Sequence, residues 1–506
     1  MLGILSSALL TTAVGATPCA SLQSVALTRA TIVTSEVVEA GVFHEPDPPP
    51  GVRRAPSPPP EPIPRHCRVT MVLRPTSDSH INVELWMPTD QWNGKLLVVG
   101  NGGFAGWIQG YGDMQIALRL GYAAAATDTG HSSDDGPNGM FGLGHQEKIV
   151  DFAYRAIHEL TLASKQIIGD FYARMPQYSY FKGCSTGGRQ AVMAAQRYPD
   201  DFDGIIAGAL ANRHIHMHTA GFARSVALAR HPERALPEEK AKLVSDAVMK
   251  QCDTLHEGFL NNPRLCTFDF STLLCPGAER DTCLTAGQLR SVETFYGGVK
   301  TTAGALVFSG QALGNPIPVL RSVPPASVTD TVRIWAFQDP NYDWSSFDLD
   351  RDMPIIDRKI GFVDAVDPDL TAFKAHGGKL LLYAGWGDTS ITPENTVLYY
   401  ESVLGRMGQS QDDWTRLFMV PGMGHCRGGD GPHAFDTIGA LEQWREQGRA
   451  PSSIMARNPQ SGLSRPLCPY PQYARYAGRG DLKDAANWTC TDAPQAARAV
   501  AAADAR

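Results

Sequence analysis

The sequence predicts an α/β fold, in which a mostly parallel sheet is covered by helices on both faces and interrupted by a large inserted lid. Three observations support this prediction. From Lys95 onward, short apolar runs alternate with stretches of helical periodicity, a pattern typical of parallel strands joined by crossover helices. Several apolar runs lead directly into Gly-rich turns. The alternation stops between residues 212 and 370, where loop signals dominate, and then resumes.

Length and composition place the chain among ordinary globular proteins. Its 506 residues are 43% hydrophobic and 19% charged, which excludes wholesale disorder and a protein that crosses a membrane many times. The length predicts one large core with a substantial insertion, or two to three domains. Lys and Arg number 45 against 52 Asp and Glu, and no long basic run occurs, so we expect no nucleic-acid partner.

The first residues are predicted to be an export signal. A short apolar stretch ends in Val14, Gly15 and Ala16, small residues that suit a cleavage site after Ala16. The stretch lacks a preceding Lys or Arg, so a buried N-terminal helix is the alternative. It is too short to span a bilayer, and no later segment is long and apolar enough. We therefore expect a secreted or periplasmic protein without a membrane anchor.

The predicted organisation begins with two alternating segments that suggest an antiparallel hairpin, separated by a proline-rich surface loop at 44–66. The α/β part follows, before and after the insertion. We predict a signal peptide at 1–16, the first part of the core at 17–211, the lid at 212–370, the second part of the core at 371–490 and an Ala-rich tail at 491–506. The expected strands, some with their turns, are 25–43, 67–87, 95–100, 122–130, 178–183, 379–388 and 416–425, and the expected helices are 147–172 and 189–199.

Ten cysteines follow the predicted cleavage site, and their even number predicts up to five disulfides in an oxidising compartment. A zinc site is the rival interpretation, but no C-x-x-C pair with a second knuckle is present. Close spacing suggests three pairs, and a fourth would tie together the ends of the proline-rich loop. These pairs are Cys252–Cys266, Cys275–Cys283, Cys468–Cys490 and Cys19–Cys67.

A candidate nucleophile lies in the run Gly183-Cys184-Ser185-Thr186-Gly187, which matches the pattern G-x-S-x-G. The run falls between a predicted strand and a predicted helix, the setting in which a sharp turn presents a nucleophilic serine. Glycines are needed on both sides because a Cβ there would clash. The turn would place the Ser185 hydroxyl at the positive end of the helix dipole.

A serine hydroxyl needs a general base, and the base needs a group that orients it. Asp388 ends a predicted strand and His425 follows the next, in the required chain order of serine, acid and histidine. Either could be a loop residue when taken alone, but together at strand ends they predict a triad with Ser185. Cys184 precedes the serine and Cys426 follows the histidine, so a triad would bring the cysteines within disulfide distance. Two free thiols, or partners elsewhere, are the alternative.

A tetrahedral intermediate needs hydrogen-bond donors for its oxyanion. One expected donor is the backbone N–H of Thr186, the residue after the nucleophile. The loop at residues 100–104 is expected to supply the second, and we favour the N–H of Gly103. A purely structural turn is the alternative.

The motifs G-C-S-T-G-G-R-Q and G-M-G-H-C, with an Asp after a strand between them, resemble those of the tannase and feruloyl esterase family. This family includes the enzyme that cleaves mono(2-hydroxyethyl) terephthalate. The similarity also covers residues 101–106, 144–159, 339–352 and 466–471, and runs from about residue 20 to residue 490. The resemblance implies an α/β-hydrolase core with a lid, five disulfides including one between the cysteines beside the serine and the histidine, and hydrolysis of aromatic-acid esters.

The family also tends to bind a structural calcium in the lid, through a loop of the type C-D-A-L-D-G-x-x-D-G. The corresponding run here, Cys-Asp-Thr-Leu-His-Glu-Gly at 252–258, is shorter and lacks two of the aspartates. Ca²⁺ takes about six to eight oxygen ligands, and Asp253 and Glu257 alone give few of them. We therefore predict no tightly held calcium, no other metal and no cofactor.

Two features of the lid allow more than one interpretation. His214, His216 and His218 form H-x-H-x-H, and only the first and last would share a helix face. We expect solvated or lid-lining histidines rather than a metal site. The run R-I-W-A-F at 333–337 could offer a cation and aromatic rings to an aromatic acid, or it could pack in the core with a surface arginine.

The predicted function is that of a secreted serine carboxylesterase that acts on small aromatic-acid esters through an acyl-enzyme. Galloyl, feruloyl and terephthalate monoesters are all open as substrates. A peptidase or amidase that uses the same triad is one alternative. A non-catalytic binding protein on a hydrolase fold is the other.

Overall fold

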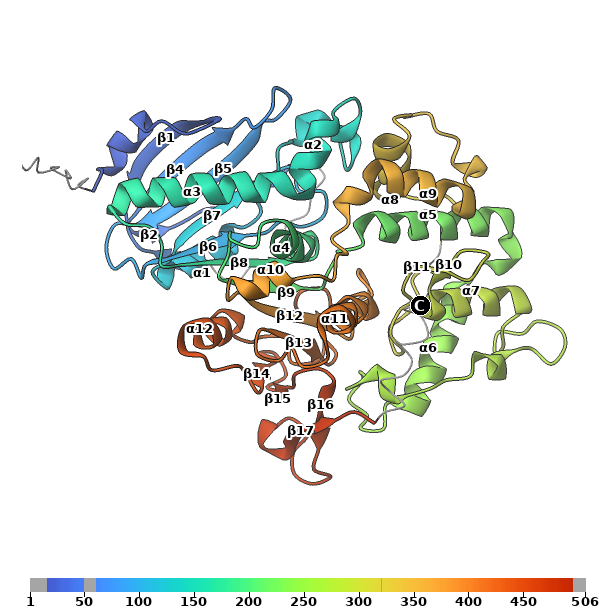
Figure 1. Cartoon of the computed structure of the whole chain (residues 1–506). Coiled ribbons are helices and arrows are strands. Elements are labelled where there is room, and N and C mark those ends of the chain that lie inside the picture. Colours follow the sequence, from blue (N-terminus) through green and yellow to red (C-terminus); the bar gives the residue numbers. More distant parts are fainter. Residues whose placement is uncertain (1–15, 50–60, 320, 495–506) are drawn as a thin grey trace, which may run out of the picture.

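The computed structural model describes residues 16–49, 61–319 and 321–494. The predicted signal peptide and tail fall almost entirely outside these ranges, as does the middle of the proline-rich loop. Within them, nine strands form one sheet in the order β1-β4-β5-β7-β6-β8-β9-β12-β13 (Figure 1). The strands are β1 (Ala30–Val38), β4 (His66–Leu73), β5 (Ile81–Pro88), β6 (Lys95–Val99), β7 (Ala123–Thr127), β8 (Tyr178–Cys184), β9 (Gly204–Gly208), β12 (Lys379–Gly385) and β13 (Thr415–Val420).

Six strands, from β7 to β13 in the sheet order, run parallel to one another, so the predicted α/β class is confirmed. The central strands are apolar on both faces because each face is covered. In β6, Leu96 and Val98 pack into the cluster on one face, and Leu97 and Val99 pack into the cluster on the other.

Helices cover both faces of the sheet. Helices α3, α4 and α11 pack on the first face, for example through Leu160 and Val192, and α1 and α12 pack on the second, for example through Met114 and Leu441. The helices of this core are α1 (Tyr111–Arg119), α2 (Gln146–Val150), α3 (Ala156–Tyr172), α4 (Thr186–Arg197), α10 (Thr371–Ala375), α11 (Pro393–Met407) and α12 (Thr437–Gln447).

The antiparallel edge of the sheet differs from the prediction in one respect. Strand β1 pairs with β4 as expected for a hairpin partner, but residues 67–87 contain two strands, β4 and β5, which also pair with each other. The chain reverses between them in the run that begins Pro75-Thr76-Ser77, because proline has no N–H to donate to a ladder. The short pair β2 (Gly41–Val42) and β3 (Pro62–Ile63) closes the two ends of the proline-rich loop.

Between β9 and β12 the chain leaves the sheet and forms the inserted segment. Its helices and its hairpin lie beside the sheet in Figure 1, where they are green to gold. They are α5 (His214–Arg230), α6 (Glu238–Cys252), α7 (Ala286–Gly297), α8 (Ala326–Asp330) and α9 (Leu349–Ile360), with β10 (Val299–Lys300) and β11 (Leu306–Phe308). None of the helices in the described part of the chain is long and apolar enough to cross a membrane.

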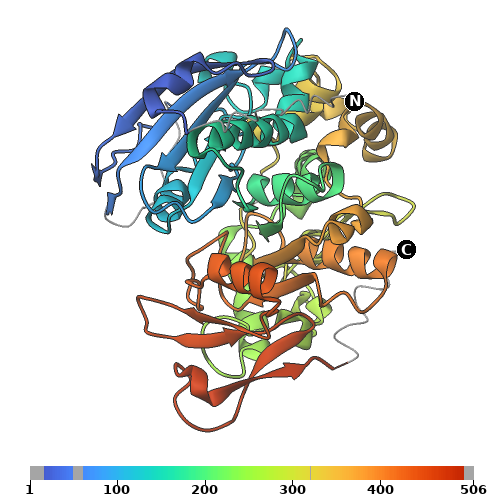
Figure 2. The same cartoon turned by 60° about the vertical axis from the view of Figure 1, so that its left-hand side comes forward.

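Two C-terminal hairpins lie beside the last strand of the sheet (Figure 2). The N–H of Tyr470 donates to the carbonyl of Leu417 at 2.7 Å, and Phe418 pairs with Pro469. This contact covers the edge of β13, which would otherwise present unpaired backbone groups. The hairpins are β14 (Ile454–Arg457) with β15 (Ser464–Leu467), and β16 (Gln472–Tyr476) with β17 (Trp488–Asp492).

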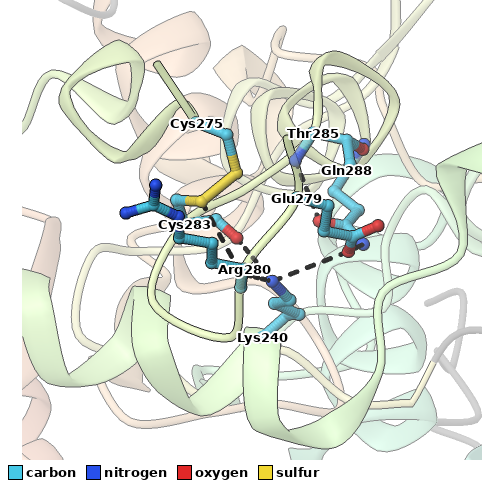
Figure 3. Close-up of a disulfide and its surroundings, with 7 residues drawn as sticks. All are labelled: Lys240, Cys275, Glu279, Arg280, Cys283, Thr285 and Gln288. Carbon is cyan, nitrogen blue, oxygen red and sulfur yellow. Dashed lines mark hydrogen bonds and ion pairs between the residues drawn. A yellow bond between two sulfur atoms is a disulfide. The ribbon is translucent and has the colours of Figure 1, made fainter. Parts of the chain in front are cut away.

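All ten cysteines lie in the described ranges and form five disulfides. Each of the four pairs suggested by spacing or loop closure is formed, together with Cys184–Cys426. Figure 3 shows the Cys275–Cys283 pair of the inserted segment, whose loop is held by the buried Lys240. The Lys240 Nζ donates to the carbonyl of Cys283 at 2.6 Å and lies 3.6 Å from the carboxylate of Glu279.

Candidate active site

Ser185 lies in the sharp turn between β8 and α4. Its backbone has φ 65° and ψ −124°, a conformation that residues with a side chain rarely adopt. The turn is possible because its neighbours are glycines: a Cβ on Gly183 would overlap the carbonyl of Gly187, and one on Gly188 would overlap the carbonyl of Gly208. The N–H of Ser185 donates to the same Gly208 carbonyl at 3.0 Å, which ties the turn to β9.

Asp388 and His425 form a pair at the ends of neighbouring parallel strands. The His425 Nδ1 lies 2.7 Å from Asp388 Oδ2, and the Asp388 side chain is fully buried. The second carboxylate oxygen accepts the N–H groups of Ser390 at 2.8 Å and Ile391 at 3.0 Å. These bonds fix the carboxylate, which in turn orients the imidazole and leaves its Nε2 as the nitrogen that is available to a hydroxyl.

The Cys184–Cys426 disulfide connects the turn that carries Ser185 to the loop that carries His425. The Cα atoms of the two cysteines are 6.0 Å apart, although 242 positions separate them in sequence. Among the described residues, no direct hydrogen bond joins the Ser185 hydroxyl to His425. Such bonds are often long in unliganded enzymes and shorten when substrate binds.

The histidine loop rests directly on the end of the strand that carries the aspartate. A Cβ on Gly385 would overlap the carbonyl of Met423, so only glycine allows the two segments to approach this closely. The N–H of Gly387 donates to the same Met423 carbonyl at 2.9 Å. This contact fixes the position of the loop that carries His425 relative to Asp388.

The two predicted oxyanion donors lie side by side, one at the first residue of α4 and one in the loop that follows β6. The Thr186 hydroxyl donates to the carbonyl of Gly103 at 2.6 Å, and the N–H of Gly187 donates to the carbonyl of Asn101 at 2.6 Å. Within the described chain, the backbone N–H groups of Gly103 and Thr186 have no hydrogen-bond acceptor. Two unpaired N–H groups are therefore present beside the Ser185 turn.

Two residues that the sequence patterns did not indicate hold the Gly103 loop against α4. Gln190, which is buried on α4, accepts the N–H of Asn101 at 2.9 Å and donates to its side-chain oxygen at 3.2 Å. The Asn101 amide then donates to the carbonyl of Thr127 at 2.7 Å. Gln190 ends the motif G-C-S-T-G-G-R-Q and Asn101 lies in the loop at residues 100–104, so a polar residue within each segment was the signal that could have indicated the contact.

Arg189, the neighbour of Gln190 on α4, is fully buried. Its guanidinium donates to the carbonyls of Ala153 at 2.7 Å, Phe152 at 3.1 Å and Val363 at 3.2 Å. The first two belong to a π-helical turn, Asp151–Arg155, which separates α2 from α3 within the single helix that was predicted. Burial lowers the pKa of Arg189 to about 10.

The inserted segment also contacts the candidate site. The Asn315 side chain donates to the carbonyls of Trp386 at 3.0 Å and Asp388 at 3.3 Å. A buried asparagine that bonds two carbonyls fixes the backbone that carries the aspartate. Nothing in the local sequence distinguishes Asn315 from an ordinary loop asparagine.

The three histidines at the start of α5 do not share one environment. His214 and His218 share a helix face, with ring centroids 4.3 Å apart, and both rings contact Phe104 of the loop at residues 100–104. His214 is buried rather than solvated, and burial lowers its pKa well below the usual value. His216 points elsewhere and lies 2.6 Å from Asp364. No cluster of three or more possible metal ligands occurs among the residues described.

The run at 333–337 packs in the core, which is the second of the two arrangements that its sequence allowed. Trp335 is buried and donates its indole N–H to the carbonyl of Gly139 at 2.7 Å. Arg333 forms an ion pair with Asp330 at 3.0 Å. Phe337 is stacked on Tyr342. These contacts give the run a structural role.

The loop that corresponds to the calcium site of the family does not fit that ion. The Asp253 carboxylate accepts the backbone N–H groups of Glu257 at 3.1 Å and Gly258 at 2.9 Å. The Glu257 carboxylate forms a buried ion pair with Arg465 at 2.6 Å. The guanidinium already supplies the positive charge that a cation would bring, and few oxygen ligands are left.

A nucleophile turn between a strand and a helix, followed by an acid and a histidine on later strands, defines the α/β-hydrolase class. The family described as "Tannase and feruloyl esterase" matches residues 67–313 and 322–491. The chain therefore belongs to the tannase and feruloyl esterase family, whose members are carboxylic ester hydrolases, and it is such an enzyme.

The similar proteins cover nearly the whole chain. An uncharacterized esterase of Xanthomonas campestris pv. campestris is 36% identical over 97% of this chain and 94% of its own length. A probable feruloyl esterase B-2 of Aspergillus terreus is 32% identical over 84% of this chain and 86% of its own. The crystal structure of feruloyl esterase B from Aspergillus oryzae superposes with a TM-score of 0.85 at 29% identity, covering 94% of this chain and 99% of that one.

Proposed function

We propose that this protein is a secreted serine esterase that hydrolyses esters of aromatic acids, with Ser185 as nucleophile, His425 as general base and Asp388 as its orienting acid. The observation that carries the proposal is the Cys184–Cys426 disulfide, which adjoins both Ser185 and a His425 that is already paired with Asp388 at 2.7 Å. The five disulfides support the assignment to an oxidising compartment outside the cytosol.

In the proposed reaction, His425 Nε2 removes the proton from Ser185 Oγ while the oxygen attacks the ester carbonyl. The C=O bond opens to an oxyanion, which the N–H groups of Thr186 and Gly103 stabilise. The imidazolium then gives its proton to the leaving alcohol, and the acyl–Oγ ester remains. Water, activated by His425 in the same way, attacks this ester and releases the acid and the free serine. No cofactor or metal takes part in the proposed steps.

We propose feruloyl esters as the first substrates to test, because the A. terreus and A. oryzae relatives are named feruloyl esterases. We also propose that residues 212–370 act as a lid. The bonds from Asn315 to the backbone of Trp386 and Asp388 support this, since they connect the segment to the candidate triad.

Steady-state rates on methyl ferulate, methyl gallate and mono(2-hydroxyethyl) terephthalate test the substrate class. We expect the highest kcat/KM on methyl ferulate and no activity in Ser185→Ala, whose melting curve stays close to that of the wild type. A matched anilide distinguishes an amidase, because ester hydrolysis should be much the faster reaction. Full esterase activity in Ser185→Ala would remove Ser185 from the proposed role.

A further inference from the structure

The inserted segment contains a cavity of about 540 Å³ whose lining includes none of the candidate triad. One wall is a face of α5 and the opposite wall is a face of α7, with β10 between them; Figure 1 shows these three elements together at the right of the molecule. The size lies within the range of about 300–1,000 Å³ that small-molecule sites occupy.

Four arginines line this cavity, and their charges are not balanced by carboxylates. Arg224 and Arg230 come from α5, Arg290 comes from α7, and Arg234 follows α5, while Glu293 is the one acidic residue of the lining among those described. The Arg230 guanidinium donates to the carbonyls of Ser345 at 2.7 Å and Phe347 at 2.8 Å. Carbonyl dipoles hold that side chain in place without neutralising its charge.

Arg224 and Arg234 are half-buried, and neither guanidinium has a hydrogen-bond or ion-pair partner among the described residues. Arg224 makes no hydrogen bond or ion pair with any described residue, and burial lowers its pKa. The Nε of Arg234 is buried and has no hydrogen-bond partner. A buried donor without an acceptor, such as the Arg234 Nε, is costly, and the Arg224 guanidinium is free to donate, so the cavity is suited to a ligand with acceptors of its own.

The remaining walls are apolar. Val226 of α5, Val299 of β10 and Phe347 are buried side chains that face the cavity between the arginines. A guanidinium binds a carboxylate through two parallel hydrogen bonds, and apolar walls favour a flat hydrocarbon body. An inorganic anion would use only the arginines and would make no contact with the apolar walls.

We propose that this cavity is a second ligand site, distinct from the candidate active site, that binds a small aromatic carboxylate with its acid group on Arg224 and Arg290 and its ring against Val226, Val299 and Phe347. The proposal goes beyond ester hydrolysis and does not depend on it. Only the choice of ferulate as the probe rests on the proposed function.

Calorimetric titration of the full-length enzyme with ferulate tests the site, after Ser185 has been blocked with a fluorophosphonate so that the active site does not contribute. We expect one saturable site. Arg224→Gln and Arg290→Gln should each weaken binding by about ten-fold or more, since each removes a charged hydrogen-bonding group. Arg65→Gln is the matched control, because Arg65 is exposed and paired with Glu39 elsewhere on the surface.

Two further ligands define the class. Methyl ferulate, which lacks the charge, and sulfate, which lacks the ring, should both bind at least ten-fold more weakly than ferulate. Arg290 is exposed, so its replacement keeps the test valid even if Arg224→Gln lowers the melting temperature. No saturable binding, or equal binding in both variants and the wild type, would overturn the site, and sulfate binding as tight as ferulate would overturn the ligand class. Failure of the fluorophosphonate to label Ser185 would instead count against the proposed function.

Discussion

Cys184 and Cys426 are joined by a disulfide although 242 positions separate them, and each is the direct neighbour of a proposed catalytic residue. The bond therefore restrains the distance between the turn that carries Ser185 and the loop that carries His425. The other four disulfides join residues that are between 8 and 48 positions apart, and none of them adjoins the candidate triad. The long-range disulfide is thus the one whose loss should affect both stability and chemistry.

Replacing both Cys184 and Cys426 with alanine should lower kcat strongly, because His425 is then held near Ser185 only by loop packing. The free energy of unfolding should fall by about 2–5 kcal/mol. The double replacement of Cys275 and Cys283 is the matched control: it also removes a disulfide, but one in the inserted segment, and kcat should change little. Esterase kinetics and chemical denaturation measure the two effects. Equal losses of kcat in both double variants would mean that the Cys184–Cys426 bond has no special relation to the chemistry.

Asp388→Asn should reduce kcat by about 10³–10⁴-fold while the fold is retained, because the amide stabilises the wrong tautomer of His425 and no longer stabilises the imidazolium. The N–H groups of Ser390 and Ile391 can still donate to the remaining side-chain oxygen, so the loop should keep its shape. Asp369→Asn is a suitable control, since that carboxylate bonds Arg406 at the surface. Wild-type kcat in Asp388→Asn, measured under saturating substrate, would exclude the assigned role.

Gln190→Leu should lower kcat by about ten-fold or more and change KM much less. The replacement leaves the N–H of Asn101 without its acceptor, so the loop that carries the proposed Gly103 donor is no longer fixed against α4. Gln196→Leu is a control on the same helix, where the amide donates to the Tyr399 hydroxyl at 2.9 Å and makes no bond to the loop at residues 100–104. If the two variants show the same kcat and KM, the Asn101–Gln190 contact does not position the donor.

His131 should make the protein less stable as the pH falls. Burial lowers the pKa of this histidine to about 4, and its ring is stacked on Phe141 with 3.6 Å between centroids. The folded state keeps the ring neutral, whereas the unfolded chain takes up a proton near pH 6.5. The stability that depends on the neutral ring is therefore fully present above about pH 6.5. It is lost as the pH falls from about 6.5 to 4. The loss amounts to about 3 kcal/mol for one group.

Melting temperatures between pH 7.5 and 4.5 measure this effect. His131→Gln should melt lower at neutral pH, because the stacking is lost, but its melting temperature should depend less on pH than that of the wild type. His231→Gln, which changes an exposed histidine, should keep the wild-type slope. An unchanged slope in His131→Gln would show that His131 does not contribute to the pH dependence of stability.

The sequence was most informative where one residue type is required by the local backbone. Strands that end in glycine turns predicted β6, β8, β12 and β13, and the glycines around Ser185 are needed because a Cβ there would overlap a carbonyl. The neighbours Cys184 and Cys426 could be paired because each is next to a residue that a triad would bring together. These inferences needed only chain order and sterics.

Other contacts could not be predicted because they depend on how distant segments meet. Asn315 bonds the backbone around Asp388, and Gln190 bonds Asn101, across separations of 73 and 89 positions. The burial of His214 could not be predicted for the same reason, since it comes from aromatic residues on three separate segments. Helical periodicity also could not show the π-helical turn at Asp151–Arg155, because it is a single turn with helical segments on both sides.

The most direct measurement is to treat the intact protein with a fluorophosphonate and to locate the label by peptide mass spectrometry. The account predicts one equivalent of label on the hydroxyl of Ser185, complete loss of esterase activity in step with labelling, and a greatly slowed labelling rate in His425→Ala. Label on another residue, or esterase activity that survives full labelling of Ser185, would contradict it.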